Sequence, residues 1–180
     1  MTCEHPSSAK YKNGLGEICI KCDPSLFVEA PRRPYYDPRP TWDEYYLGIA
    51  KAVSVRADCT RRKIGAILVN AHNRHRGSGY NGGRSKGPSC IQGECPRGRT
   101  NVVAPGSSYD TGEGACVAIH AEQNLCLETT PEERRDGTIY ITDEPCDGCL
   151  RMLKGSGVIR IVWPDGEWKK FSERMWVKNA

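Results

Sequence analysis

The sequence contains no apolar run long enough to cross a membrane, which takes about 20 consecutive residues. Its first ten residues, MTCEHPSSAK, also lack the apolar core of a secretory signal peptide. These two absences predict a cytoplasmic location. Because that compartment keeps thiols reduced, the 10 cysteines need another purpose than disulfides. Their spacing favours metal binding.

The chain also lacks a strong excess of charge of one sign and is poor in phenylalanine. Its net charge is +4, and only 2 of its 180 residues are Phe. A dedicated binder of nucleic acid carries a strongly basic surface and aromatic side chains on which bases stack. The composition therefore disfavours a polynucleotide partner, without excluding one, and suits a small anionic ligand. Hydrophobic and charged contents of 38% and 27% are those of a globular protein.

Three segments differ in composition. Residues 1–23 hold a compact Cys/His cluster, and residues 24–40 are rich in Pro and Arg, which indicates an extended linker. Residues 41–180 form the main domain. Thr41 and Glu44 make a T-x-x-E capping box, and apolar residues then recur on one helical face as far as Ala57.

The main domain reads as alternating strands and helices, an α/β pattern. A buried strand over 64–69 forms a hairpin with a segment that ends at Tyr80. The loop over 82–116 is too long to be structureless unless it is functional or clamped. The pattern then predicts a helix over 117–128, a strand over 138–142, a helix over 146–154 and a strand over 158–163, with the last three forming a parallel crossover. A short amphipathic helix over 165–180 is expected to cover a sheet face with Trp168, Phe171 and Trp176.

The most informative motif is H-A-E at 120–122 followed by P-C-D-G-C at 145–149. His120, Cys146 and Cys149 supply one imidazole and two thiolates, which is a three-ligand zinc set with the fourth position open for water. The two cysteines are three residues apart, so on a helix they point the same way. Glu122 is placed to take a proton from that water and to pass it to a substrate. This H-x-E…P-C-x-x-C pattern is the known signature of zinc deaminases.

Two other interpretations of the motif stay open. Cys116 or Cys126 as a fourth ligand would make a closed, structural zinc site. A zinc module used only for binding is the second, but such a module has no need of Glu122.

Three further stretches surround the motif: C-T-R-R-K-I-G-A from Cys59, G-Y-N-G from Gly79 and A-I-H-A-E-Q-N from Ala118. Together with the zinc motif they resemble the deoxycytidylate deaminase branch of the cytidine deaminase superfamily, from about residue 42 to residue 163. The resemblance implies a cytidine deaminase-like three-layer α/β/α fold with a five-stranded mixed sheet. It also implies a homo-oligomer, usually a hexamer, and in many members control by deoxynucleoside triphosphates at the Gly-Tyr-Asn-Gly loop.

The activity that the resemblance implies is zinc-dependent hydrolysis of dCMP to dUMP and ammonia, which feeds thymidylate synthesis. Glu122 is then the catalytic residue, and His120, Cys146 and Cys149 bind the catalytic Zn²⁺. The expected substrate contacts are Asn81, Tyr80, Ala121 and Arg62. Arginine matches phosphate oxygens best, and the residues alone do not decide between Arg61, Arg62, Arg84, Arg97 and Arg99 as the phosphate ligand.

The remaining cysteines predict further zinc. Cys3, His5, Cys19 and Cys22 resemble a short zinc knuckle in a segment too small to fold alone. Four more thiols recur in members of the branch that the chain resembles and are candidates for a structural zinc that pins the long loop: Cys59, Cys90, Cys95 and Cys116. The alternative in both cases is a set of free thiols.

Other deaminases remain as alternatives. A polynucleotide base deaminase, acting on adenosine in tRNA or on cytosine in single-stranded DNA, uses the same kind of pocket. A related cytosine-nucleotide deaminase differs only in the sugar or phosphate count. Deaminases of pterin or flavin pathways usually carry a reductase domain, for which 180 residues are too few.

Overall fold

The computed structural model describes residues 10–13, 16–19, 38–99, 103, 107–109, 111, 112 and 114–179. The chain divides into two compact units, Met1–Arg39 and Pro40–Ala180. In the first unit, β1 (Lys10–Asn13) and β2 (Gly16–Cys19) pair antiparallel, with Lys10 opposite Cys19. Of the predicted zinc knuckle, Cys3, His5 and Cys22 lie outside the described residues, and Cys19 is described only by its backbone. Over the described parts of the chain, no helix is both long and apolar enough to span a bilayer.

The second unit is built on a mixed sheet in the order β4-β3-β5-β6-β7-β8. Only β5 and β6 run parallel, and every other neighbouring pair is antiparallel. The mixed sheet and the parallel crossover are as predicted, but the sheet has six strands where five were expected. The strands are β3 (Gly65–Val69), β4 (His75–Tyr80), β5 (Thr138–Ile141), β6 (Arg160–Trp163), β7 (Gly166–Ser172) and β8 (Met175–Asn179).

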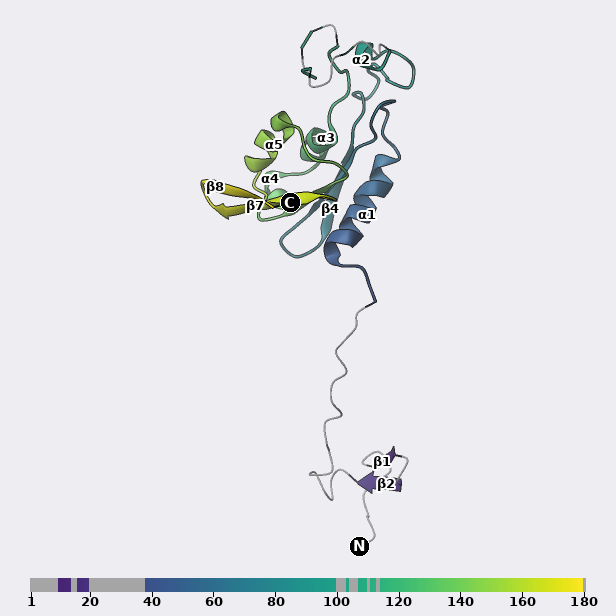
Figure 1. The fold of residues 1–180 in the computed structure, drawn as a ribbon, viewed down its shortest axis with the longest axis vertical. Helices are drawn as coiled ribbons and strands as arrows, with labels where there is room; N and C mark the ends of the chain where they lie inside the picture. The colour runs from purple at the N-terminus through teal and green to yellow at the C-terminus, as the bar shows by residue number, and fades with distance from the viewer. Residues whose placement is uncertain are drawn as a thin grey trace. The chain divides into compact units, whose positions relative to one another are not determined.

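One face of the sheet is covered by α1 (Trp42–Ser54) (Figure 1). The capping box of Thr41 and Glu44 is formed, so the helix begins where the sequence predicted. Tyr46 and Ala50 pack on the side chains that β3, β5 and β6 direct toward α1. Gly65 allows this close approach, because a Cβ there would lie 2.1 Å from the Ala50 carbonyl oxygen.

The opposite face carries α3 (Ala121–Glu128) and α5 (Asp147–Lys154) (Figure 1). Ala121 and Leu125 of α3 and Leu153 of α5 join the buried cluster that also contains alternate residues of β3, β5 and β6. The three-layer α/β/α arrangement is therefore confirmed. Two short helices, α2 (Pro96–Arg99) and α4 (Pro131–Arg134), lie in the connections. The helix predicted over 117–128 begins only at Ala121.

The predicted helix over residues 165–180 is wrong, because this segment forms the hairpin of β7 and β8. Trp163 of β6 pairs with Gly166 of β7 across a two-residue connection, and β8 then pairs with β7 as the sixth strand. Trp168 and Trp176 do pack against the core on the α5 face, where the Lys154 ammonium lies 3.5 Å from the centre of the Trp168 ring. Phe171 does not cover the sheet and is 75% exposed.

A polar network ties the start of α1 to the sheet. Two nitrogens of Arg160 donate to the two carboxylate oxygens of Asp43 at 2.7 and 2.6 Å, and the Tyr140 hydroxyl donates to Asp43 at 2.8 Å. The hydrogen bonds from Arg160 hold the pKa of the Asp43 carboxyl below its ordinary value. The lowered pKa means that the ionised form stabilises the folded protein.

Replacing Asp43 with asparagine is expected to lower the free energy of unfolding at pH 7 by about 1 kcal/mol, since the pair is partly exposed. The lowered pKa sets the direction of the pH dependence. The Asp43 carboxylate contributes its full stabilisation above about pH 3.9, the pKa of aspartate in the unfolded chain. This stabilisation is lost as the pH falls through the lower pKa of Asp43 in the folded protein. Urea unfolding from pH 7 to pH 3 should show the variant and the wild type converging in acid. A difference that stays constant over this range, or that appears equally in the exposed Asp165→Asn control, would contradict the assignment.

Candidate active site

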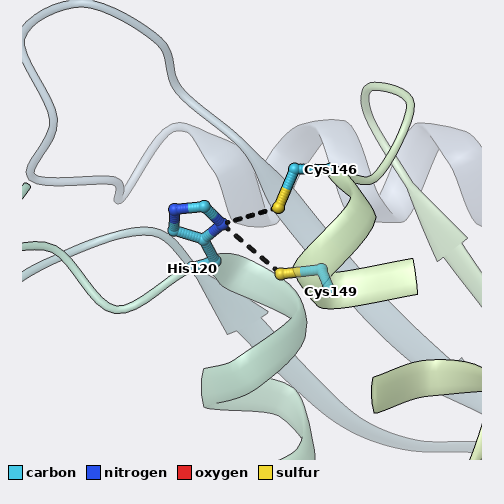
Figure 2. Close-up of side chains that lie close together, drawn as sticks. All are labelled: His120, Cys146 and Cys149. Carbon is cyan, nitrogen blue, oxygen red and sulfur yellow. Dashed lines mark hydrogen bonds between the residues drawn. The ribbon is translucent and has the colours of Figure 1, made fainter. Parts of the chain in front are cut away.

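Three side chains meet between the N-terminal ends of α3 and α5. The Nδ1 atom of His120 lies 3.5 Å from the sulfur of Cys146 and 3.4 Å from the sulfur of Cys149 (Figure 2). Their ligand atoms all lie within 4.8 Å of one another. This is the set that the sequence placed around zinc. Neither Cys116 nor Cys126 belongs to the group in the described part of the chain, so the alternative of a closed site gains no fourth ligand there.

Local structure explains how the three side chains converge. His120 and Cys146 are the N-cap residues of α3 and α5, and Cys149 follows in the first turn of α5. The backbone N–H of His120 donates to the Gln123 side chain at 2.9 Å, which leaves the imidazole free to face the sulfurs. Gly79 of β4 allows α3 to sit close to the sheet, because a Cβ there would lie 2.3 Å from the Ala121 carbonyl oxygen.

The electrostatics of the site favour a bound cation wherever the thiols and the carboxyl are ionised. Burial raises the pKa of the Cys149 thiol, and the neighbouring Glu122 and Cys146 act in the same direction. Burial also raises the pKa of the Glu122 carboxyl, which is only 4% exposed. Two thiolates and a carboxylate are therefore costly here without a compensating positive charge. One imidazole and two thiolates fit Zn²⁺, and the helix N-termini favour thiolate as well.

A cavity of about 260 Å³ opens beside the three ligands. His120, Ala121, Glu122 and Cys146 form part of its wall, so Glu122 faces the same space as the metal site. The long loop also contributes side chains to the wall: Cys90, Cys95, Arg97 and Cys116. The volume is close to that of a small-ligand site.

The expected substrate contacts fall into two groups. Arg62, Asn81 and Ala121 line the cavity, whereas Tyr80 does not. The Asn81 side chain is engaged with the backbone: its Oδ1 accepts from Ile64 N–H at 2.8 Å and its Nδ2 donates to the Arg62 carbonyl at 2.8 Å. Asn81 therefore fixes the segment that carries Arg62 at the mouth of the cavity.

Among the five arginines considered for phosphate, Arg61, Arg62 and Arg97 line the cavity, and Arg84 and Arg99 do not. The Arg62 side chain is 56% exposed and forms an ion pair with Asp143. Asp143 was not predicted as a site residue. Its position just after β5, one of the two parallel strands, was the available signal, because ligands bind beyond the carboxyl ends of such strands.

The four other thiols also lie on the cavity wall: Cys59, Cys90, Cys95 and Cys116. Each sulfur accepts a hydrogen bond from the backbone, with Arg62 N–H donating to Cys59 at 3.5 Å and the backbone of Thr60 and Ala118 donating to Cys90 and Cys116. Burial and the neighbouring Cys95 raise the pKa of Cys90 to about 12.

Cys95 differs from the other three thiols of this quartet. Burial acts to raise the pKa of Cys95. Hydrogen bonds to its sulfur outweigh burial and bring the pKa below its ordinary value. The donors are the backbone N–H of Val117, the Cys90 thiol, and the backbone N–H groups of Gly98 and Arg97. These hydrogen bonds therefore favour the ionised form of Cys95, whereas burial disfavours the ionised forms of Cys90 and Cys116.

No sequence pattern pointed to Tyr109, which lies on the irregular loop and also lines the cavity. Its ring meets the His120 ring edge to face, with centroids 5.2 Å apart. The Tyr109 ring also contacts Arg97, whose guanidinium carbon lies 4.2 Å from the centre of the ring. No spacing rule applies to a loop of this kind, so only the structure brings these side chains together.

Fold and site together define a zinc enzyme that activates water, with three protein ligands and a buried carboxylate beside an open cavity. Residues 40–164 match the family model of the cytidine and deoxycytidylate deaminase zinc-binding region. The chain belongs to this family, and the protein is a zinc-dependent hydrolytic deaminase.

Several relatives carry the same activity in their names. The chain is 44% identical to the deoxycytidylate deaminase of Mycobacterium phage D29 over 126 residues, which cover 70% of this chain and 96% of that protein. It is 32% identical to the deoxycytidylate deaminase of Schizosaccharomyces pombe, with 69% of this chain and 37% of that protein covered. The crystal structure of a dCMP deaminase from cyanophage S-TIM5 aligns with a TM-score of 0.49 at 22% identity, over 69% of this chain and 83% of that chain.

Proposed function

We propose that the protein hydrolyses dCMP to dUMP and ammonia. The observation that carries the proposal is the buried Glu122 beside His120, Cys146 and Cys149 in a cavity with arginines at its wall. The identity of 44% to a deoxycytidylate deaminase that the match covers almost entirely supports the choice of substrate. The product, dUMP, would feed thymidylate synthesis.

Zn²⁺, when bound by His120, Cys146 and Cys149, supplies an activated water by lowering its pKa to about 7. Glu122 does the proton transfer. Burial raises the pKa of its carboxyl, which makes the carboxylate a better proton acceptor than an exposed glutamate. It takes a proton from the attacking water and delivers it to the ring nitrogen next to the amine-bearing carbon. It then passes the second proton of that water to the departing amine.

The atoms balance without another reactant. The oxygen of water forms a new bond to C4 of the pyrimidine, and the bond from C4 to the exocyclic nitrogen breaks. That nitrogen leaves as ammonia with one added proton, and the ring nitrogen keeps the other. Glu122 ends the cycle in its starting protonation state.

We propose Arg62 as the ligand of the substrate phosphate. It is exposed at the mouth of the cavity, and its present partner is the Asp143 carboxylate, a planar anion with oxygens much like those of a phosphate. A phosphate with two negative charges would take over this guanidinium from Asp143. Asn81 holds the Arg62 backbone in place for this contact.

Arg62→Met is expected to raise KM for dCMP by about 10- to 100-fold, because one charge-assisted contact is lost. The KM for deoxycytidine, which has no phosphate, should barely change. Steady-state kinetics on both substrates test the proposal, with Arg84→Met as the control because Arg84 does not line the cavity. Equal losses on dCMP and deoxycytidine would refute the phosphate contact, and no turnover of dCMP by the wild type would refute the function.

We also propose that Cys59, Cys90, Cys95 and Cys116 hold a structural zinc. Four thiols share one wall, and the backbone donates hydrogen bonds to all of them, which stabilises thiolates around a metal. Such a site would fasten the loop after Gly82 to the segment that precedes His120.

Cys95→Ser is expected to remove about one zinc ion per chain and to lower Tm by several degrees, since the metal stabilises only the folded loop. Metal analysis by mass spectrometry after gel filtration gives the stoichiometry. Cys126→Ser, at a half-buried cysteine outside the quartet, serves as the control. An unchanged zinc content in Cys95→Ser would mean that the quartet holds free thiols.

Further proposals come from the sequence. Cys3, His5, Cys19 and Cys22 would bind another zinc in residues 1–23, joined by the linker 24–40 to the catalytic domain 41–180. The family resemblance supports assembly into a homo-oligomer, usually a hexamer. It also supports deoxynucleoside triphosphates as effectors that bind at the Gly-Tyr-Asn-Gly loop. The seven described free cysteines support a reducing, cytoplasmic location.

A further inference from the structure

Arg97 is the most deeply buried arginine of the described residues, with 7% of its surface exposed. Its guanidinium donates to the Ser108 carbonyl at 2.7 Å, the Gly114 carbonyl at 3.0 Å, and the Ser107 carbonyl and hydroxyl at 3.1 Å each. No carboxylate of the described residues is among these acceptors. A buried cation that is held by carbonyl oxygens gathers the loop around it.

The same guanidinium supports an aromatic ring. Its carbon lies 4.2 Å from the centre of the Tyr109 ring, which is a cation–π distance. The Tyr109 carbonyl accepts a hydrogen bond from Cys116 N–H at 2.8 Å, so the backbone of Tyr109 is fixed as well. Tyr109 is therefore held from two directions.

The Tyr109 ring in turn contacts a metal ligand. It stands at 86° to the His120 ring with 5.2 Å between centroids, the edge-to-face geometry that aromatic pairs prefer. His120 is the N-cap of α3, and its backbone N–H is held by the Gln123 side chain. Among the ring contacts of the described residues, the one to the His120 imidazole comes from Tyr109.

We propose that Arg97 and Tyr109 are positioning residues for the zinc ligand His120. Arg97 holds the Tyr109 ring, and the ring holds the imidazole with Nδ1 toward the sulfurs of Cys146 and Cys149. In this role both residues act through His120. Their contribution lies in the affinity and geometry of the metal centre, so it is independent of which nucleotide the enzyme accepts.

Tyr109→Leu is expected to lower the zinc affinity of the catalytic centre by about tenfold, the loss typical when a group that orients a metal ligand is removed. Tyr109→Phe keeps the ring and should retain wild-type affinity. Arg97→Met should reproduce the effect of Tyr109→Leu, and the double variant should be little worse than either single one, because both changes break one chain of contacts. Zinc affinity is measured by competition with a chromophoric chelator.

The visible spectrum of the cobalt-substituted protein gives a second readout. Subtracting the spectrum of Cys149→Ser isolates the bands of the catalytic centre from those of other thiolate sites. These bands should shift in Tyr109→Leu and Arg97→Met and stay in place in Tyr109→Phe. Tyr45→Leu, the same change at a tyrosine on α1, is the control. Wild-type affinity and unshifted bands in Tyr109→Leu, or strictly additive effects in the double variant, would overturn the proposal.

Discussion

Replacing Glu122 with glutamine is expected to lower kcat for dCMP deamination by about 100- to 10,000-fold, the contribution of a general acid–base group. Glutamine keeps the volume of the side chain in a place where only 4% of it is exposed, but it cannot carry a proton between water and the pyrimidine. Zinc content should stay at the wild-type level, because Glu122 is not among the three ligands. Ammonia release under saturating dCMP measures the effect.

The matched control is Glu128→Gln at the exposed end of the same helix, where the charge change is identical and the cavity is remote. It should keep wild-type kcat. Tm should not fall in Glu122→Gln, since a buried carboxyl with a raised pKa does not stabilise the fold at neutral pH. A Glu122→Gln variant with wild-type kcat and full zinc would show that another group transfers the proton.

Replacing Cys149 with serine is expected to abolish zinc binding at the catalytic centre and to lower kcat by about 1,000-fold or more. A hydroxyl is a poor zinc ligand, and without the metal the pKa of the water is no longer lowered to about 7. The side chain is buried, with 1% of its surface exposed, so no solvent-borne group can take its place. Metal analysis and kcat are measured on the same preparation.

Cys126→Ser separates this result from a general loss of buried thiols. Cys126 lies on α3, half-buried, and is outside the three-residue group of the described chain. It should retain catalytic zinc and kcat. Loss of zinc in Cys126→Ser would instead favour a closed four-ligand site with a structural role.

The structure brings the side chains of the zinc motif together, and this convergence was predictable because local structure determines their positions. The spacing of Cys146 and Cys149 already places both thiols at one helix start, and the H-A-E motif places His120 and Glu122 at another. The buried hairpin over residues 64–80 and the capping box at Thr41 are equally local signals, and the structure contains both.

The C-terminal segment was mispredicted because its aromatic residues fit two patterns. The spacing of Trp168 and Trp176 fits one face of a helix, but they lie on neighbouring strands that pair across a hairpin. The Asp165-Gly166 pair, a common turn signal, was the feature that distinguishes the two. Tertiary packing on α5 decided the outcome.

The contacts around His120 were beyond sequence reasoning for a different reason. Arg97 and Tyr109 are 12 positions apart in a loop without periodicity, and their contact depends on carbonyl groups that the loop presents to one guanidinium. Such an arrangement leaves no repeat or spacing in the sequence. Asp143, by contrast, stands at a predictable strand end and was simply not considered.

The most direct test of the central claim is ammonia release by the zinc-loaded protein from a panel of substrates in parallel. The panel contains dCMP, CMP, deoxycytidine, dCTP, single-stranded DNA and tRNA, each with and without dCTP as activator. The account predicts rapid release from dCMP and little from the polymers. Silence on every monomer together with turnover of DNA or tRNA would contradict it and identify a polynucleotide deaminase.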